Sequence, residues 1–319
     1  MAEPHGSSNS PPGPPGGGYV GRFAPSPTGD LHLGSLYAAA GAYLDARSRG
    51  GRIHLRIDDL DRPRERPGAT DRILRTLAAF GFEWDGAIVH QSARSADHRA
   101  ALETLHALER LYACDCSRRE RTSGDAVYAG TCRSRRDPIR GPHALRVRVD
   151  PVDITIDDRI QGPFRMNLAA LGDFIVQRRD AIVAYPLAVV VDDAALGVTD
   201  VVRGADLLES TPAQCFLQTL LSLPAPRYAH LPVLTEPGGA KLAKSRRSVP
   251  LDGRIASRQL IAVFDWLGLA PPPALARARV DELWTWGIAH WDARRVPRRP
   301  NLPLPAAAGP PLAPPPPAG

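Results

Sequence analysis

The chain has 319 residues, of which 43% are hydrophobic and 23% are charged, and its formal net charge is +6. These proportions are ordinary for a globular protein with a core of normal size, and the positive charge is compatible with a polyanionic partner. Four cysteines in a chain of this length exclude a secreted disulfide scaffold. No basic segment leads into an apolar run at the N-terminus, and no stretch of about 18 apolar residues occurs, so we expect a cytoplasmic protein without a secretory signal or a membrane span.

The first part of the chain alternates between strands and helices. Residues 19–24 predict a strand, which a proline-rich turn connects to a helix over residues 33–48, and residues 52–57 predict a second strand. Apolar residues at helical spacing predict further helices over residues 69–80 and 96–111. A strand, a helix and a strand at this spacing are typical of a right-handed parallel βαβ unit.

The alternation weakens over residues 112–180, where turn residues and charges become frequent, and we interpret this stretch as an inserted subdomain. It returns with predicted strands over residues 186–191 and 197–203. Predicted helices follow over residues 211–221 and 255–267.

Both ends of the chain have a biased composition. Pro, Gly and Ser dominate residues 4–18, and Pro and Ala dominate from about Val296. Such segments bury too little apolar surface to offset the entropy that ordering costs. We therefore expect tails over residues 1–18 and 296–319, the first unstructured and the second either unstructured or locally extended as polyproline II.

Residues 22–35 read RFAPSPTGDLHLGS, which predicts a strand end, a stiff turn and a helix start. Free backbone N–H groups and the positive end of the helix dipole make such a place an anion site. His32 adds a donor that can stabilise charge growing on a phosphate, and Gly34 lets a ligand approach the backbone. The alternative is a plain strand-to-helix turn in which His32 is structural.

Residues 241–245 read KLAKS and follow a Pro-Gly-Gly turn. Lys241 and Lys244 lie three residues apart on this loop and can reach a polyphosphate as it develops negative charge. Taken alone, a solvated basic loop is the better interpretation, because Arg246 and Arg247 follow.

Together, in this order and with an insertion between them, the two motifs resemble the two signatures of class I aminoacyl-tRNA synthetases. The resemblance is strongest to the glutamyl branch and extends from about residue 19 to residue 267. It is carried by RFAPSPTG at 22–29, RIDDLD at 56–61, VVVDD at 189–193 and GVTDVVRGAD at 197–206.

The resemblance implies an α/β fold with the Rossmann-like parallel sheet of class I synthetases. We expect the two halves of this catalytic domain at residues 19–111 and 181–250, with a zinc-bearing subdomain of the acceptor-binding type inserted at 112–180. A short helical C-terminal part is expected at residues 251–295.

Three of the cysteines, Cys114, Cys116 and Cys132, lie close together in the sequence. Thiolates at this spacing can share one tetrahedral zinc ion, with His143, Tyr128 or a water as the fourth ligand. Chemistry alone favours His143, because tyrosine is an unusual zinc ligand. Glutamyl-queuosine tRNA(Asp) synthetases are similar here, with Cys-x-Cys followed by Tyr-x-x-x-Cys, and this resemblance implies one structural zinc ion held by the three cysteines and Tyr128. The other interpretation is three unrelated buried thiols.

The resemblance also implies glutamate as a substrate. Arg22 and Arg203 are the candidates for its carboxylates, since a planar guanidinium suits a carboxylate, and Asp58 is the candidate for its ammonium group. The Tyr185 hydroxyl is expected to close the pocket. The family usually has glutamate at the position of Asp58, so a water or a small backbone shift is needed for contact with the amine. The alternative for these charged residues is a structural ion pair. The remaining predicted pocket residues are Phe23, Ala24, Pro25 and Ser26.

Two steps are implied. The glutamate carboxylate attacks the α-phosphate of ATP, which is bound with Mg²⁺, and gives glutamyl-adenylate and pyrophosphate; a hydroxyl on RNA then attacks the activated carbonyl. His32 and the helix start are expected to stabilise the α-phosphate, and Lys244, assisted by Lys241, the pyrophosphate. The predicted ATP site consists of Thr28, His32, Gly34 and Lys244.

The acceptor is inferred from chain length. Ordinary glutamyl-tRNA synthetases carry a large helical anticodon-binding part after the lysine loop, and residues 246–319 are too few for one. We therefore expect no anticodon-binding domain, as in the glutamyl-queuosine enzymes, which modify the queuosine base in the anticodon of tRNA(Asp). Arginines around the zinc site are expected to contact RNA phosphates or else to form a solvated basic surface. They are Arg118, Arg119, Arg121, Arg133, Arg135 and Arg136.

Two other functions stay open at this point. One is a truncated glutamyl-tRNA synthetase that charges the 3′ end of tRNA. The other is a non-catalytic, zinc-containing RNA-binding module, against which the presence of both His32 and Lys244 argues. We expect the protein to be a monomer.

Overall fold

The structure is a computed structural model, and it describes residues 18–116, 127–128, 130–135, 137–236 and 251–304. The two strands and two helices expected at the start of the chain are present, and a short third strand at Val89–His90 was not predicted. Strands β1 (Val20–Phe23), β2 (Arg52–Ile57) and β3 (Val89–His90) form a parallel sheet, and they alternate with helices α1 (Leu33–Arg47) and α2 (Ala69–Ala79).

Strands from the second half of the chain extend this sheet. β9 (Asp200–Gly204) pairs in parallel with β10 (Arg227–Leu231), and β9 also lies against β1. The Thr199 N–H just before β9 donates to the Val20 carbonyl at 2.9 Å. The strands therefore follow one another as β3, β2, β1, β9 and β10, so the order reverses at β1. Ligands of open α/β sheets bind at the carboxyl ends of strands at such a point.

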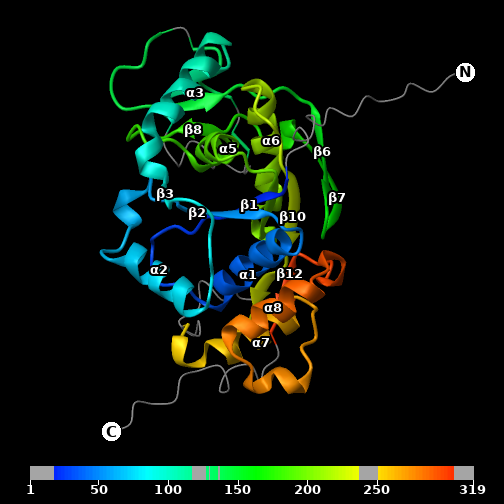
Figure 1. Cartoon of the computed structure of the whole chain (residues 1–319). Helices are drawn as coiled ribbons and strands as arrows, with labels where there is room; N and C mark the ends of the chain where they lie inside the picture. Colours follow the sequence, from blue (N-terminus) through cyan, green and yellow to red (C-terminus); the bar gives the residue numbers. More distant parts are fainter. Residues whose placement is uncertain (1–17, 117–126, 129, 136, 237–250, 305–319) are drawn as a thin grey trace, which may run out of the picture.

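Helix α1 is buried on nearly all sides because its sequence, LGSLYAAAGAYLDAR, is apolar around most of its circumference. It contacts β1, β2 and β9 as well as two C-terminal helices, α7 (Ala256–Trp266) and α8 (Val280–His290). α7 confirms the predicted late helix. In Figure 1, α1, α7 and α8 lie on one side of the sheet, and α5 and α6 lie on the other.

The segment predicted as an insertion contains two small antiparallel units. β4 (Leu111–Cys114), β5 (Ala144–Val147) and β8 (Ile175–Gln177) form one sheet, and β6 (Asp153–Asp158) and β7 (Gly162–Asn167) form a hairpin. The preceding helix α3 (Ser95–Ala107) ends earlier than its predicted end at residue 111. Glu109, at φ 55°, turns the chain into β4.

The predicted strand over residues 186–191 is wrong, because this stretch lies within helix α5 (Tyr185–Ala195). Pro186 stands in the first turn of α5, where its missing N–H costs nothing. The apolar run Leu187–Val191 is buried on every side of the helix, against α3 and α6 (Thr211–Leu220). A short, fully buried apolar run has no periodicity that distinguishes a helix from a strand. The predicted helix over residues 211–221 is confirmed by α6.

The expectation of an unstructured chain from Val296 onwards is wrong for residues 296–304. Strand β12 (Asn301–Pro303) pairs in parallel with β11 (Val233–Thr235), and Val296 and Leu304 are buried. Proline is tolerated here because an edge strand needs its N–H groups on one side only. Among the helices that the structure describes, none is long and apolar enough to span a bilayer.

Candidate active site and metal centre

The N-terminus of α1 opens onto a cavity of about 190 Å³. His32, Gly34 and Ser35 line one side of it. The other side comes from the last residue of β9, Gly204, and from residues after β9 and β10, among them Asp206 and Pro232. The cavity thus lies where the carboxyl ends of the parallel strands meet, next to the reversal of strand order.

His32 is the N-cap of α1, and its Nδ1 accepts the Ser35 N–H at 3.3 Å. Burial lowers the pKa of His32, so its ring is neutral at neutral pH and Nε2 carries the hydrogen. The predicted donor is therefore present at the helix start. A Cβ on Gly34 would lie 3.0 Å from the His32 ring, so this glycine makes room for the imidazole itself.

Arg22 on β1 and Arg203 on β9 are both buried, and their strands are neighbours. The Arg22 Nε donates to Asp193 Oδ2 at 3.3 Å, and the Arg203 Nη1 lies 3.5 Å from the hydroxyl of Tyr185 at the start of α5. Tyr185 is 38% exposed, so this end of the pocket is open. The structure therefore brings three of the predicted glutamate-binding residues to one end of the sheet.

Asp58, directly after β2, is engaged within the protein. Arg56 Nε donates to Asp58 Oδ1 at 2.7 Å, and Arg56 Nη1 donates to Asp193 Oδ1 at 2.6 Å. Burial raises the pKa of Asp58 against the opposing effect of Arg56, whereas the pKa of the equally buried Asp193 is lowered by Arg22 and Arg56. Asp193 thus links two guanidinium groups. Neither Arg56 nor Asp193 had a predicted role, although Arg56 begins the string RIDDLD and Asp193 ends the string VVVDD.

The remaining predicted residues are less closely placed. Phe23, Ala24 and Pro25 are partly buried, and the Pro25 carbonyl accepts the Asp58 N–H at 3.0 Å, while Ser26 and Thr28 are exposed in the turn before α1. Lys241 and Lys244 lie outside the described residues.

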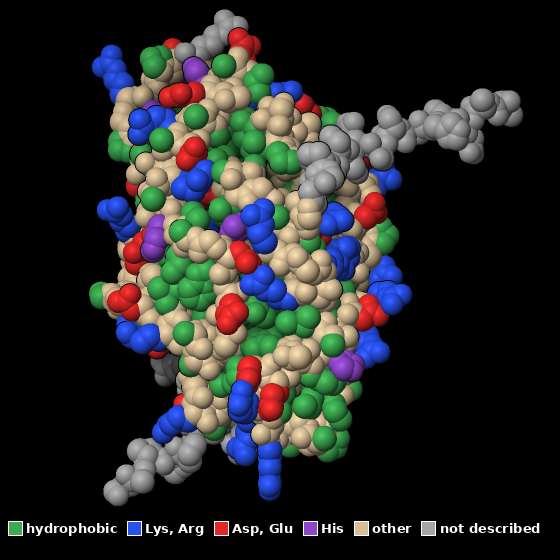
Figure 2. All heavy atoms as spheres, viewed as in Figure 1, with side chains coloured by type: hydrophobic (Ala, Val, Ile, Leu, Met, Phe, Trp, Pro, Cys, Tyr) green, Lys and Arg blue, Asp and Glu red, His purple; other side chains and the backbone are tan. Residues whose placement is uncertain are grey.

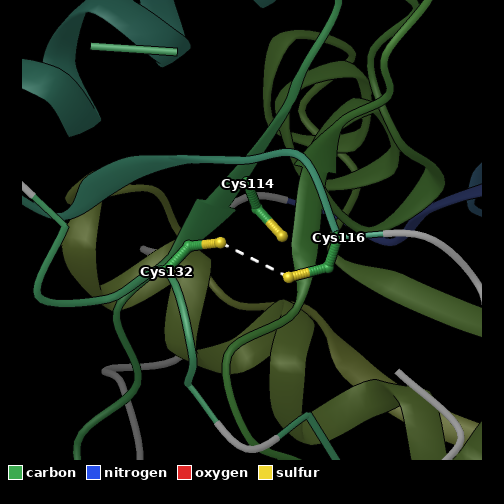
Figure 3. Close-up of side chains that lie close together, drawn as sticks. All are labelled: Cys114, Cys116 and Cys132. Atoms are coloured by element: carbon green, nitrogen blue, oxygen red, sulfur yellow. Dashed lines mark hydrogen bonds between the residues drawn. The ribbon is translucent and has the colours of Figure 1, made fainter. Parts of the chain in front are cut away.

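Figure 3 shows the side chains of Cys114, Cys116 and Cys132 pointing toward one another. Their Sγ atoms all lie within 4.8 Å of one another, and those of Cys116 and Cys132 are 3.4 Å apart. The Tyr128 hydroxyl lies 3.7 Å from Cys114 Sγ and 3.8 Å from Cys116 Sγ. Zn–S bonds of about 2.3 Å in a tetrahedron separate the ligand atoms by about 3.8 Å, so these four donors fit one zinc ion.

His143 is not part of this cluster. Its Nδ1 lies 3.0 Å from the Gly141 carbonyl, and no histidine in the described part of the chain joins the three thiols. Of the two protein ligands left open by the sequence, the geometry favours Tyr128.

Arg146 on β5 adds positive charge to the thiol cluster, with its guanidinium 3.7 Å from the centre of the Tyr128 ring. Burial raises the pKa of the Cys114 thiol, but hydrogen bonding by Arg146 and other donors outweighs it and brings this pKa to about 7. Burial and the Cys132 thiol raise the pKa of Cys116 to about 11. A cation beside a thiol favours the thiolate, which is the form that binds a metal.

The basic surface predicted around this centre is partly neutralised. Arg135 pairs with Asp115 at 2.8 Å, and Arg133 lies 3.6 Å from Asp173. The other four arginines of that prediction, Arg118, Arg119, Arg121 and Arg136, lie outside the described residues. Figure 2 shows basic and acidic side chains interspersed over the visible face, not gathered into one basic patch.

A cleft of about 700 Å³ lies beside the thiols. Cys114, Cys116 and Arg146 line one wall, and Arg64 and Arg178 contribute from the loop after β2 and the loop after β8. The cleft lies between the inserted sheet and the loop after β2, and guanidinium groups line it on both sides. The carboxylates of Asp61 and Asp180 also line it and pair with Arg64 and Arg178.

Comparison with known proteins gives the family. Residues 19–255 match the family model for tRNA synthetases class I (E and Q), catalytic domain. The chain is a class I tRNA synthetase. It is therefore a ligase, and both the predicted family and the predicted fold class are confirmed.

Curated relatives of this synthetase are similar over nearly their whole length. It is 52% identical to the glutamyl-Q tRNA(Asp) synthetase of Ectopseudomonas mendocina over 285 residues, which cover 89% of this chain and 97% of the relative. It is 53% identical to the protein of the same name from Chromobacterium violaceum over 294 residues, 90% of this chain and 98% of the relative. The chain thus belongs to this branch of the family.

Solved structures of two glutamate-tRNA ligases have a fold similar to that of this synthetase. The glutamate-tRNA synthetase of Elizabethkingia anophelis matches with a TM-score of 0.77 at 25% identity, over 91% of this chain and 68% of that one. A glutamate tRNA ligase from Elizabethkingia meningosepticum, solved with its amino acid, matches with a TM-score of 0.75 at 24% identity, over 89% of this chain and 66% of that one.

Proposed function

We propose that this synthetase activates L-glutamate with ATP and transfers it to the queuosine base in the anticodon of tRNA(Asp). The observation that carries the proposal is the buried pair of guanidinium groups, Arg22 and Arg203, beside the cavity at the start of α1. Gly204, which lines that cavity, directly follows Arg203, so the pocket for an anionic amino acid adjoins the pocket for a phosphate. Relatives about 50% identical over nearly their whole length carry the name glutamyl-Q tRNA(Asp) synthetase, and this supports the choice of acceptor.

In the first step, Arg203 and the Tyr185 hydroxyl hold one carboxylate of glutamate, and Arg22 holds the other. Asp58 receives the ammonium group through a water, because its own oxygens are bonded to Arg56. The α-carboxylate oxygen then forms a bond to the α-phosphorus of ATP, and the bond from that phosphorus to the bridging oxygen breaks and releases pyrophosphate.

Charge develops on the phosphates during this step. His32 Nε2–H and the free N–H groups at the start of α1 stabilise it at the α-phosphate. Lys244, with Lys241, stabilises the leaving pyrophosphate; this assignment rests on the sequence motif alone. Mg²⁺ supplies charge neutralisation when it is bound with the nucleotide.

In the second step, a hydroxyl of the RNA attacks the carbonyl carbon of glutamyl-adenylate, and AMP leaves with the bonding electron pair. The cleft between the two sheets receives the RNA, with Arg64 and Arg178 as phosphate contacts. The three cysteines and Tyr128 would hold a structural zinc ion, which would fix the end of β4 at the wall of this cleft.

Acceptor labelling tests this proposal. The protein is incubated with ATP, Mg²⁺ and labelled glutamate, and with tRNA from cells that make queuosine or from cells that do not. Each pool is also used after enzymatic removal of the 3′-terminal adenosine. We expect label only on queuosine-containing tRNA(Asp), and we expect it to survive removal of that adenosine.

Other outcomes contradict the proposal in distinct ways. Label on both pools that disappears with the terminal adenosine means a synthetase that charges the 3′ end. No label, together with no glutamate-dependent exchange of pyrophosphate into ATP, means an RNA-binding protein without catalysis.

A further inference from the structure

A buried aspartate and histidine lie directly behind Arg203. Asp158 ends β6, and His230 lies on β10, and the side chain of each is fully buried. His230 Nδ1 lies 2.6 Å from Asp158 Oδ2, and His230 Nε2 lies 3.1 Å from Arg203 Nε. Asp158, His230 and Arg203 thus form a chain of hydrogen bonds from the inserted hairpin to the pocket.

The hydrogen-bonding partners define the state of the histidine. The Asp158 carboxylate accepts the backbone N–H groups of Ile160, Gln161 and His230 at 2.7–3.1 Å, so it stands as an acceptor. His230 must then donate through Nδ1. His230 Nε2 lies near two groups, Arg203 Nε at 3.1 Å and Thr211 Oγ1 at 3.2 Å. The Nε–H of Arg203 is a donor under all conditions, so Nε2 accepts from it and carries no hydrogen. Burial, opposed by Asp158, lowers the pKa of His230, which agrees with a neutral ring.

This arrangement fixes the guanidinium of Arg203. Its Nε bonds to His230, and its Nη2 donates to Thr211 Oγ1 and to Gln214 Oε1, both at 2.8 Å. The described bonds therefore occupy one edge of the guanidinium. The remaining nitrogen, Nη1, is directed to the Tyr185 hydroxyl at the open end of the pocket.

We propose that Asp158 and His230 are positioning residues that hold Arg203 with Nη1 toward the carboxylate of the amino-acid substrate. This inference rests on the proposed function, in which Arg203 binds glutamate. A group that is already fixed in the bound geometry loses little entropy when the substrate arrives, so the pair acts on substrate affinity.

Substitution at Asp158 changes the tautomer of His230 with little change in volume. In Asp158→Asn, Oδ1 can keep the backbone N–H groups, while the amide nitrogen faces His230 Nδ1 as a donor. The histidine hydrogen then moves to Nε2, where it opposes the Arg203 Nε–H; an asparagine in place of an orienting aspartate reverses a histidine tautomer in this way. We expect the KM for glutamate to rise about tenfold or more in pyrophosphate exchange, with the KM for ATP unchanged.

Two substitutions at His230 separate positioning from packing. In His230→Gln the side-chain oxygen can still accept from Arg203, whereas His230→Leu removes the acceptor and keeps an apolar volume. We expect the leucine variant to lose glutamate affinity as Asp158→Asn does, and the glutamine variant to keep most of it.

Asp200→Asn is the matched control: Asp200 is as buried as Asp158 and lies at the other end of β9 from Arg203, where it pairs with Arg227. It should lower thermal stability and leave the KM for glutamate unchanged.

The tautomer itself is measured by ¹H–¹⁵N NMR of the imidazole nitrogens in the full-length protein. A neutral ring with its hydrogen on Nδ1 is expected, and a charged ring or a hydrogen on Nε2 overturns the inference. An unchanged KM for glutamate in folded Asp158→Asn overturns it as well. Wild-type protein that does not respond to glutamate refutes the proposed function and, with it, the role of the pair in substrate binding; the tautomer then shows separately whether Asp158 orients His230.

Discussion

At the scale of single residues, the pocket depends on charges buried in pairs. Arg56 is completely buried, and its guanidinium lies between Asp58 and Asp193. A buried charge is tolerated only with its partner, because the desolvation cost of an uncompensated ion in the interior is several kcal/mol. Arg56 therefore favours the charged form of Asp193 and opposes the effect of burial on Asp58.

Removal of this guanidinium should be far more costly than removal of an exposed one. We expect Arg56→Met to lower the free energy of unfolding by about 3–5 kcal/mol, because it leaves two buried carboxylates without their cation. Arg64→Met is the control: Arg64 makes an ion pair of similar length, 2.6 Å to Asp61, but its side chain is 72% exposed. That variant should lose less than about 1 kcal/mol. Urea unfolding measures the free energy of unfolding of both variants. Equal decreases in the two variants would mean that burial does not make the ion pairs of Arg56 more important for stability.

At the scale of elements, the sequence predicted what depends on local pattern. The start of α1 at His32 follows from a turn motif, and β2 has apolar residues that alternate with polar ones. The structure confirms both, together with the predicted strand β1. The stretch that forms helix α5 was predicted as a strand because its apolar run is buried on every side of the helix. Such a run has no helical periodicity in the sequence. β12 was missed because its partner β11 is remote in sequence, and a proline-rich composition hides a strand that forms only through that pairing.

The residues of the candidate sites also differ in whether local sequence could predict them. Cysteine spacing predicted three members of the metal centre, since all three are close in the sequence. Choosing between Tyr128 and His143 required knowledge of where the intervening chain runs. Likewise, no motif indicates a role for Asp158 or His230, because each acquires its role only where β6 contacts β10.

The metal centre gives a prediction for the β4–β5 unit. Tyr128→Phe should weaken zinc binding about tenfold or more, because it removes the fourth ligand that the geometry of the described residues favours. Competition with a chromophoric chelator measures the affinity. His143→Ala is the matched control and should bind zinc as the wild-type protein does, since His143 bonds to Gly141 outside the cluster. Weaker binding in His143→Ala and normal binding in Tyr128→Phe would reverse the assignment.

At the scale of the whole molecule, Asp45 on α1 joins segments from three parts of the chain. Its carboxylate accepts from the Tyr19 hydroxyl at 2.6 Å, from Trp291 Nε1 at 3.0 Å, and from Arg159 after β6. The first residues of the catalytic sheet, the inserted hairpin and the C-terminal part thus meet at one fully buried carboxylate. The insertion and the C-terminal part are thereby fixed to the same helix whose N-terminus forms the proposed phosphate site.

This junction should make stability depend on pH. Burial raises the pKa of Asp45, but Arg159, Tyr19 and Trp291 outweigh it and lower this pKa from 3.8 to about 2. A carboxyl whose pKa is lower in the folded state stabilises the fold above its unfolded pKa and loses that contribution as the pH falls through the folded pKa. The contribution of Asp45 is therefore complete above about pH 4 to 5, amounts to about 2 kcal/mol, and disappears near pH 2.

The substitution Asp45→Asn tests this. We expect the variant to be less stable than the wild-type protein at pH 7, and we expect the difference to shrink as the pH falls from 5 toward 2, as measured by chemical unfolding at each pH. Asp153→Asn is the control: Arg165 also lowers the pKa of Asp153, but both side chains are exposed and solvent screens the pair. A difference between Asp45→Asn and wild type that is the same at every pH would mean that Asp45 stabilises the junction by its shape and hydrogen bonds, and not by its charge.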